Sequence, residues 1–203
     1  MRKILTLLFF IISMVINAQL NPKGFFDLSG PKKIWVLFHP FKAKKSLKIS
    51  QEAKIVSDSI AKTNLLDSDA SGGQVDAFRH AYWMARLRQE LGESAARSLG
   101  KAHENENYQT FKKNKLEDGI VPDEISSIMD LHNNEEGLKL ILKRSELSQQ
   151  SLIYAIVNAI KDGKMKIIKK NKEGNFLTCE GEIIPLKSLK GKWQNKKCLI
   201  ASN

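Results

Sequence analysis

Three short stretches of the sequence carry side chains that could perform acid–base or metal chemistry. In the first, a helix would place Asp76, Arg79 and His80 on one face, because residues three and four apart in a helix are neighbours. A carboxylate one turn before an imidazole can orient the ring or share a metal ion with it. Trp83 and Leu87 continue this face, so we expect it to be buried. Buried polar groups need partners, and hence Asp76 and His80 either serve a site or hold a neighbouring helix.

The other two stretches offer a second imidazole, two more carboxylates and two amides. His103 follows small residues that let a helix approach a neighbour, so it should point inward, with Glu104 about 100° further round the helix. Asp130 would share a helix face with Asn133 and Asn134. Two adjacent Asn residues form helices poorly, so they either mark a turn or use their amides to orient a substrate or water.

Together these residues predict one polar site shared by three helices. Its candidate members are Asp76, Arg79, His80, His103, Glu104, Asp130, Asn133 and Asn134. A divalent transition metal would be held by His80, His103, Glu104 and Asp130. Without a metal, Asp76 or Asp130 would orient a histidine that acts as general base. Arg79 would bind an anionic substrate group, while Asn133 and Asn134 would position water or a developing oxyanion.

These stretches resemble an uncharacterised bacterial domain found in secreted proteins and at the C-terminal ends of large polymorphic-toxin-like proteins. The resemblance rests on Gly-Gly-x-x-Asp-Ala-Phe-Arg-His-Ala-Tyr-Trp, then Ala-His-Glu, then Met-Asp-Leu-His-Asn-Asn-x-x-Gly, within residues 72–137. It implies that the eight candidate residues are motif positions, and it brings no established chemistry. A more distant similarity is to secreted phospholipases, in which a helical histidine and an aspartate activate water beside calcium. Here Ala81 follows His80, and no glycine-rich calcium loop precedes it.

Helices must position these side chains, and the apolar periodicity predicts five of them. They cover about residues 50–62, 74–91, 93–105, 122–143 and 148–161. Short apolar runs at 165–169, 176–179 and 182–186 predict strands joined by turns. We therefore expect a mainly α protein, a bundle of four to five helices with a small C-terminal β appendage. The helical core would span residues 50–163, with a basic loop segment at 19–49 and the basic appendage at 164–203.

The first 18 residues have the pattern of a secretory signal peptide. Arg2 and Lys3 precede an apolar run of about 13 residues, shorter than the roughly 20 that span a membrane, and cleavage is expected after Ala18. We therefore expect export to the periplasm or the exterior, with no transmembrane segment in the mature chain. In an oxidising compartment Cys179 and Cys198 would form a structural disulfide, provided that the fold brings them close enough.

The net charge of +11 is unevenly distributed along the 203 residues. Lysines dominate both ends, whereas acids outnumber bases in the middle. Such ends could bind an anionic envelope polymer or a lipid surface, or simply solubilise the protein. Aromatic residues are not interleaved with the lysines, so nucleic acid is not an expected partner. The sequence thus predicts an exported hydrolase, with or without a metal ion. The alternatives are a non-catalytic envelope protein whose polar core is structural and a phospholipase-like toxin-type domain.

Overall fold

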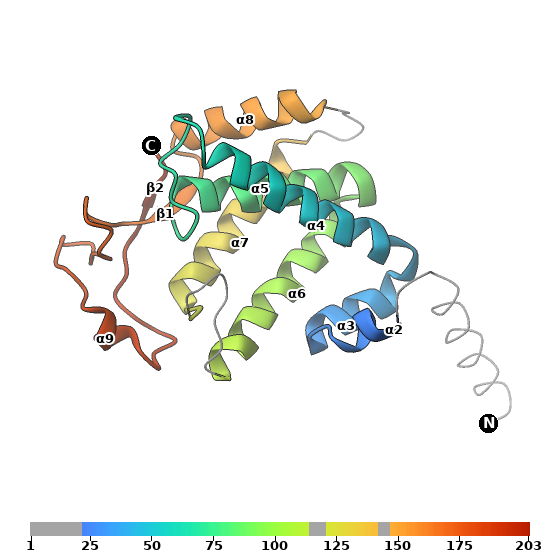
Figure 1. The fold of residues 1–203 in the computed structure, drawn as a ribbon, viewed down its shortest axis with the longest axis horizontal. Helices are drawn as coiled ribbons and strands as arrows, with labels where there is room; N and C mark the ends of the chain where they lie inside the picture. The colour runs from blue at the N-terminus through green and yellow to red at the C-terminus, as the bar shows by residue number, and fades with distance from the viewer. Residues whose placement is uncertain (1–21, 114–120, 142–146) are drawn as a thin grey trace, which may run out of the picture.

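The computed structural model describes residues 22–113, 121–141 and 147–203, and the expected signal peptide lies outside these ranges. The described part of the chain is mainly helical, with eight helices and a two-stranded antiparallel sheet near the C-terminus (Figure 1). This confirms the predicted fold class. Among the described helices, none is both long and apolar enough to cross a membrane.

The central element is α5 (Gln74–Leu91), against which α4, α6, α7 and α8 pack. The other helices are α2 (Pro22–Phe26), α3 (Gly30–Phe38), α4 (Pro40–Ile60), α6 (Glu93–Lys112), α7 (Glu124–Lys139), α8 (Gln149–Lys161) and α9 (Leu186–Leu189). The bounds of α5 agree with the predicted helix, and α8 begins one residue later than expected. The central position of α5 explains why both of its sides are apolar: Phe78, Tyr82 and Leu87 are all fully buried.

The backbones of α5 and α7 almost touch where the two helices cross. A Cβ atom on Gly137 would lie 2.3 Å from the carbonyl oxygen of Ala81 and 2.6 Å from its Cα. Only glycine fits at this crossing, because any side chain would overlap the backbone of α5. One and two turns before Gly137, α7 carries Asn134 and Asp130, which the close crossing brings next to α5.

The expected basic loop at residues 19–49 is instead mostly helical over its described part, residues 22–49, and α4 begins at Pro40 rather than near residue 50. Pro31 and Pro40 suggested a loop, but each occupies the first turn of a helix, where no backbone donor is lost. The buried stripe of α4 also consists mostly of small or polar side chains, which hydropathy does not mark as core. Its members are Ala43, Ser46, Ile49, Ala53, Ser57 and Ile60.

The C-terminal segment contains less strand than expected. β1 (Lys166–Ile168) matches the first predicted strand and pairs with β2 (Leu199–Ala201), which was not predicted. The two other predicted strands form only isolated bridges, Lys170 with Phe176 and Leu177 with Ile183. The segment nevertheless packs closely on the bundle, through a second small core made of Met129, Ile168, Phe176 and Ile184. It therefore covers one end of α5 and α7.

The predicted disulfide is confirmed, since Cys179 and Cys198 are bonded with their Cα atoms 4.9 Å apart. The bridge joins the two sides of the C-terminal segment just before β2. It restricts the unfolded chain and thereby favours the folded segment.

Loss of this bridge should lower the free energy of unfolding by about 2–4 kcal/mol. The measurement is urea denaturation of the wild type and of the double variant Cys179→Ser/Cys198→Ser, each with and without reductant. Reductant should shift the wild type to the midpoint of the variant and leave the variant unchanged. Equal midpoints for all four samples would show that the bridge contributes nothing to stability.

Candidate functional site

Three of the predicted site residues meet in a buried cluster formed by α5 and α7. His80 Nε2 lies 3.3 Å from Asp130 Oδ1 and 3.6 Å from Asp76 Oδ1. All three side chains are at most 9% exposed, and the three ligand atoms lie within 4.8 Å of one another. We call Asp76, His80 and Asp130 the His–Asp–Asp cluster. Its carboxylates come from different helices, so the cluster exists only because α5 and α7 cross so closely.

Asp76 is held in place by contacts at both carboxylate oxygens. Oδ2 accepts a hydrogen bond of 2.7 Å from the backbone N–H of Gly72, and Oδ1 accepts one of 2.7 Å from the Arg79 guanidinium. Asp76 also lies in the first turn of α5, where the helix dipole favours a negative charge. The carboxylate is therefore fixed in orientation while one of its oxygens still faces His80.

Asn134 fixes the orientation of the His80 ring from α7. Its amide oxygen lies 3.3 Å from His80 Nδ1, and in this amide orientation Nδ1–H donates to the oxygen and the lone pair of the ring is on Nε2. No well-aligned hydrogen bond reaches Nε2 from the described residues. A lone pair thus points toward two carboxylates, an arrangement that needs a cation or a proton between them.

Burial lowers the pKa of His80 well below its usual 6.5, and the nearby charges of Arg79 and His103 lower it further. The imidazole is therefore neutral at pH 7, which is the form that binds metal ions.

The stability of the metal-free protein should consequently fall as the pH drops below about 6.5. Below this pH His80 is protonated in the unfolded chain but stays neutral in the folded chain. The free energy of unfolding therefore falls by about 1 kcal/mol per pH unit. Thermal melts at several pH values should show a smaller loss for His80→Asn than for the wild type, while all other groups titrate equally in both. Identical pH profiles would contradict a neutral, buried His80.

His103 lies beside this cluster but has its own carboxylate partner. Its ring centre is 6.2 Å from that of His80, as expected for neighbouring inward side chains, and its Nδ1 is 3.7 Å from Glu106 Oε2. Burial raises the pKa of Glu106, but hydrogen bonds from His103 and Lys32 outweigh it and bring this pKa to about 2. Glu106 was not predicted as a site residue, although its position three residues after His103 on a helix was a usable signal.

Two further predicted site residues lie outside the His–Asp–Asp cluster. Asn133 is fully buried and bonds the backbone of Lys166 twice, by Oδ1 at 2.8 Å and Nδ2 at 2.9 Å, so it anchors β1 to α7. Glu104 is buried on α6 and accepts a hydrogen bond from Asn107, 3.2 Å away. Neither belongs to the group of potential metal ligands found among the described residues.

Two cavities meet at the cluster. A groove of about 750 Å³ between α3, α4, α5 and α6 is lined at its buried part by His80 and His103. A polar cavity of about 60 Å³ on the other side is lined by Asp76 and Asp130, and it has room for a water molecule or two. Arg79 lines both cavities. A substrate in the groove could therefore meet water activated at the carboxylates.

The chemistry of the donor atoms fits a divalent cation. One neutral imidazole and two carboxylates are ligands that Zn²⁺ and Mn²⁺ accept, and oxygens and nitrogen 3.3–3.6 Å apart can bind a single ion at about 2.1 Å each. With Arg79 included, the cluster carries one net negative charge, which a divalent ion would reverse.

Fold and site together define a helical domain with a buried His–Asp–Asp centre between two cavities. The chain belongs to a family described as a domain of unknown function (DUF6973), whose model matches residues 33–164. The matched region contains the whole cluster and ends before β1. No curated protein and no solved structure matches the chain significantly.

Proposed function

We propose that this protein is a metal-dependent hydrolase whose catalytic centre is the His–Asp–Asp cluster. The observation that carries the proposal is the position of His80 Nε2, which lies 3.3–3.6 Å from both carboxylates and makes no well-aligned hydrogen bond with the described residues. A divalent ion at this point would satisfy all three groups at once. Buried carboxylates facing an imidazole lone pair would otherwise destabilise the fold.

In this proposal Asp76, His80 and Asp130 would hold the metal ion, which when bound would supply a water of lowered pKa as the nucleophile. Asp76 and Asp130 also line the polar cavity, which has room for this water, and Arg79, which lines both cavities, would bind an anionic oxygen of the substrate. His103, oriented by Glu106, faces the groove and can protonate the leaving group.

Two other functions use the same residues. If the Asn134 amide were rotated by 180°, its nitrogen would donate to Nδ1, and Nε2–H would donate to Asp130. The result is a metal-free general base, or a purely structural network in a non-catalytic protein.

Metal analysis of the purified protein separates these functions. The protein should bind about one Zn²⁺ or Mn²⁺ per chain after chelation and reloading. Loaded protein should hydrolyse at least one of a set of chromogenic carboxylic and phosphoric esters, and His80→Asn should remove both metal and activity. The matched control is His132→Asn, because His132 also lies on α7 but its ring contacts the carbonyl oxygen of Lys164 rather than the cluster.

Activity that depends on His80 but survives chelation would favour the general base. Absence of both metal binding and hydrolysis would favour the non-catalytic protein. In either case the metal-dependent mechanism would be rejected.

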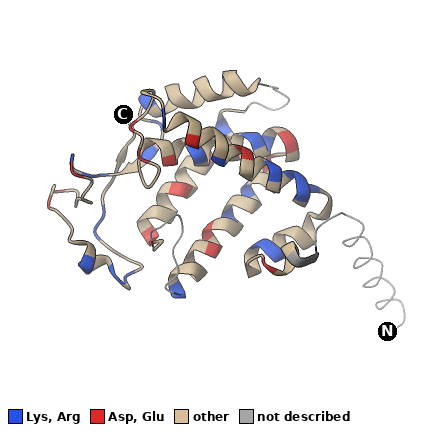
Figure 2. Ribbon diagram, in the orientation of Figure 1, with Lys and Arg blue, Asp and Glu red and all other residues tan. Residues whose placement is uncertain are grey.

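We further propose that the protein is exported and that its lysine-rich surfaces contact an anionic envelope component. Lys and Arg residues lie along α4 and in the segment around α9 (Figure 2). The disulfide is compatible with an oxidising compartment. Mass spectrometry of material secreted by the producing cell tests the export, since an intact Met1 would contradict cleavage after Ala18.

A further inference from the structure

The large groove has the character of a binding site for a hydrocarbon chain. Apolar side chains from four helices form most of its lining, among them Trp35, Val36, Trp83 and Leu99. Its volume of about 750 Å³ lies in the range of pockets that enclose small molecules. A wide apolar groove that reaches a polar centre suits a substrate with a long apolar part and a reactive polar bond.

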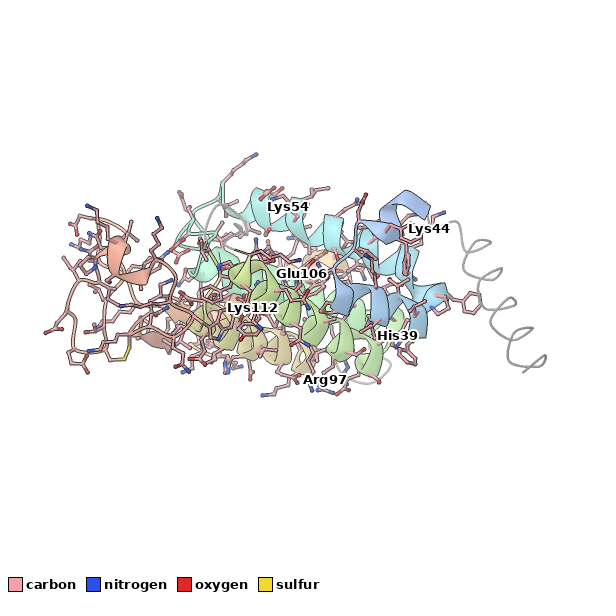
Figure 3. All side chains as sticks on the ribbon, turned by 90° about the horizontal axis from the view of Figure 1, so that it is seen from below. His39, Lys44, Lys54, Arg97, Glu106 and Lys112 are labelled. Atoms are coloured by element: carbon pink, nitrogen blue, oxygen red, sulfur yellow. A yellow bond between two sulfur atoms is a disulfide. The ribbon has the colours of Figure 1, made fainter. Side chains whose placement is uncertain are left out.

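Cationic side chains border this apolar groove. Lys32, Lys44, Lys54 and Arg79 contribute to its lining, and no acidic side chain does so among the described residues. Lys44 and Lys54 both lie on α4. In Figure 3 they are on one side of the molecule, and Arg97 is on the opposite side. The groove therefore favours a ligand that joins an apolar chain to an anionic group.

Large apolar side chains are exposed at the corner where α3 meets α4 (Figure 1). Phe38 and Phe41 are each 79% exposed, and they lie on either side of the helix junction. We call the exposed side chains Ile34, Leu37, Phe38, Phe41 and Leu47 of α3 and α4 the docking corner. Leu47 also lines the groove, so the corner and the groove are continuous.

Exposed aromatic residues among lysines are typical of surfaces that insert into anionic membranes. The aromatic rings enter the boundary between head groups and acyl chains, and the lysines are attracted to the negative surface. Lys48 on α4 is exposed and Lys33 on α3 is partly exposed, and these two helices carry the docking corner. Exposed aromatic side chains next to lysines favour a lipid bilayer, rather than an apolar protein surface, as the partner of the docking corner.

We propose that the docking corner binds an anionic lipid bilayer and that the groove takes up one acyl chain of a bilayer lipid. The ester bond of that lipid would then lie near His80, where the two cavities meet. This inference rests on the proposed function for its substrate class, since it makes the hydrolase one that acts on anionic lipids.

The first test measures the binding of the purified protein to vesicles of phosphatidylglycerol and of phosphatidylcholine. Phosphatidylglycerol vesicles should bind the protein, and added salt should weaken binding because it screens the lysines. The double variant Phe38→Ser/Phe41→Ser should bind at least about 10-fold more weakly. Leu186→Ser is the matched control, because Leu186 is 69% exposed but lies on α9, away from the groove lining.

The second test asks whether an acyl chain enters the groove. The chain has three Trp residues, and Trp35 and Trp83 line the groove whereas Trp193 packs on Tyr108 and Phe111. In a Trp193→Phe background, vesicles of phosphatidylglycerol with brominated acyl chains should quench the fluorescence of the two groove residues. Adding Leu47→Glu, which places a charge at an exposed position of the groove, should abolish the quenching.

The outcomes separate this inference from the proposed hydrolase. Asp130→Asn should still bind vesicles and show quenching, because Asp130 belongs neither to the docking corner nor to the lining of the groove. Vesicle binding without quenching, or no preference for anionic lipid, would overturn the inference even if ester hydrolysis is found. A stable dimer that the Phe38→Ser/Phe41→Ser variant disrupts, together with no vesicle binding, would assign the corner to a second copy of the chain and would also overturn it.

Discussion

Replacing Asp130 with asparagine should lower the affinity of the protein for Zn²⁺ or Mn²⁺ by about 100-fold or more. Loss of a supporting residue around a metal site already costs about 10–100-fold, and Asp130 is proposed as a direct ligand. The amide keeps the shape of the side chain but removes the negative charge 3.3 Å from His80 Nε2. Isothermal titration calorimetry of chelator-treated wild type and variant provides the measurement.

The stability of the same variant distinguishes a site from a structural network. In the metal-free protein Asp130→Asn should be as stable as the wild type or more stable, because one of two carboxylates that face the imidazole lone pair becomes neutral. Asp162→Asn is the matched control, since Asp162 is an exposed acid that pairs with Lys164 and lies outside the cluster. Unchanged metal affinity, or a marked loss of stability without metal, would reject Asp130 as a ligand.

Gly137→Ala should destabilise the protein by about 3 kcal/mol or more, and it should remove metal binding as well. Overpacking commonly costs about 1–3 kcal/mol, and here the added Cβ would meet rigid backbone at 2.3 Å rather than a flexible side chain. The helices α5 and α7 would have to separate, which would draw Asp130 away from His80. Urea denaturation and metal titration measure the two effects.

Two other glycines provide a graded comparison. Gly100→Ala should cost less, because its Cβ would meet the flexible end of Met84 at 3.2 Å. Gly30→Ala should be nearly neutral, because nothing lies within 4 Å of its Cβ position at the start of α3. Equal stability of all three variants would contradict the tight crossing of α5 and α7.

The sequence by itself determined the helical class of the fold and the central role of α5. Apolar residues on both sides of residues 74–91, ended by Gly92, could be recognised because helical periodicity is a local property. The disulfide could likewise be predicted, since only two cysteines are present. The three motifs also identified the segments from which the candidate site is built, because buried polar side chains on apolar helix faces are unusual.

The sequence did not predict α3 or the first half of α4. Their signals are weak for a physical reason: α4 buries mainly Ala and Ser, and lysines cover its outer side. The groove and the docking corner are built largely from these helices, so neither could be foreseen. Because these helices were not predicted, the surface proposed to bind a lipid bilayer was not predicted either.

Only the tertiary structure decided which polar residues meet. Asn133 and Asn134 are adjacent, but neighbouring residues of a helix point about 100° apart. Asn134 therefore contacts His80, whereas Asn133 contacts the backbone of β1. His103 reaches the groove beside Glu106, whereas Asp130 completes the cluster because Gly137 lets α7 approach α5. Distances of 3–4 Å between side chains depend on how helices cross, and crossing depends on packing between segments far apart in the sequence.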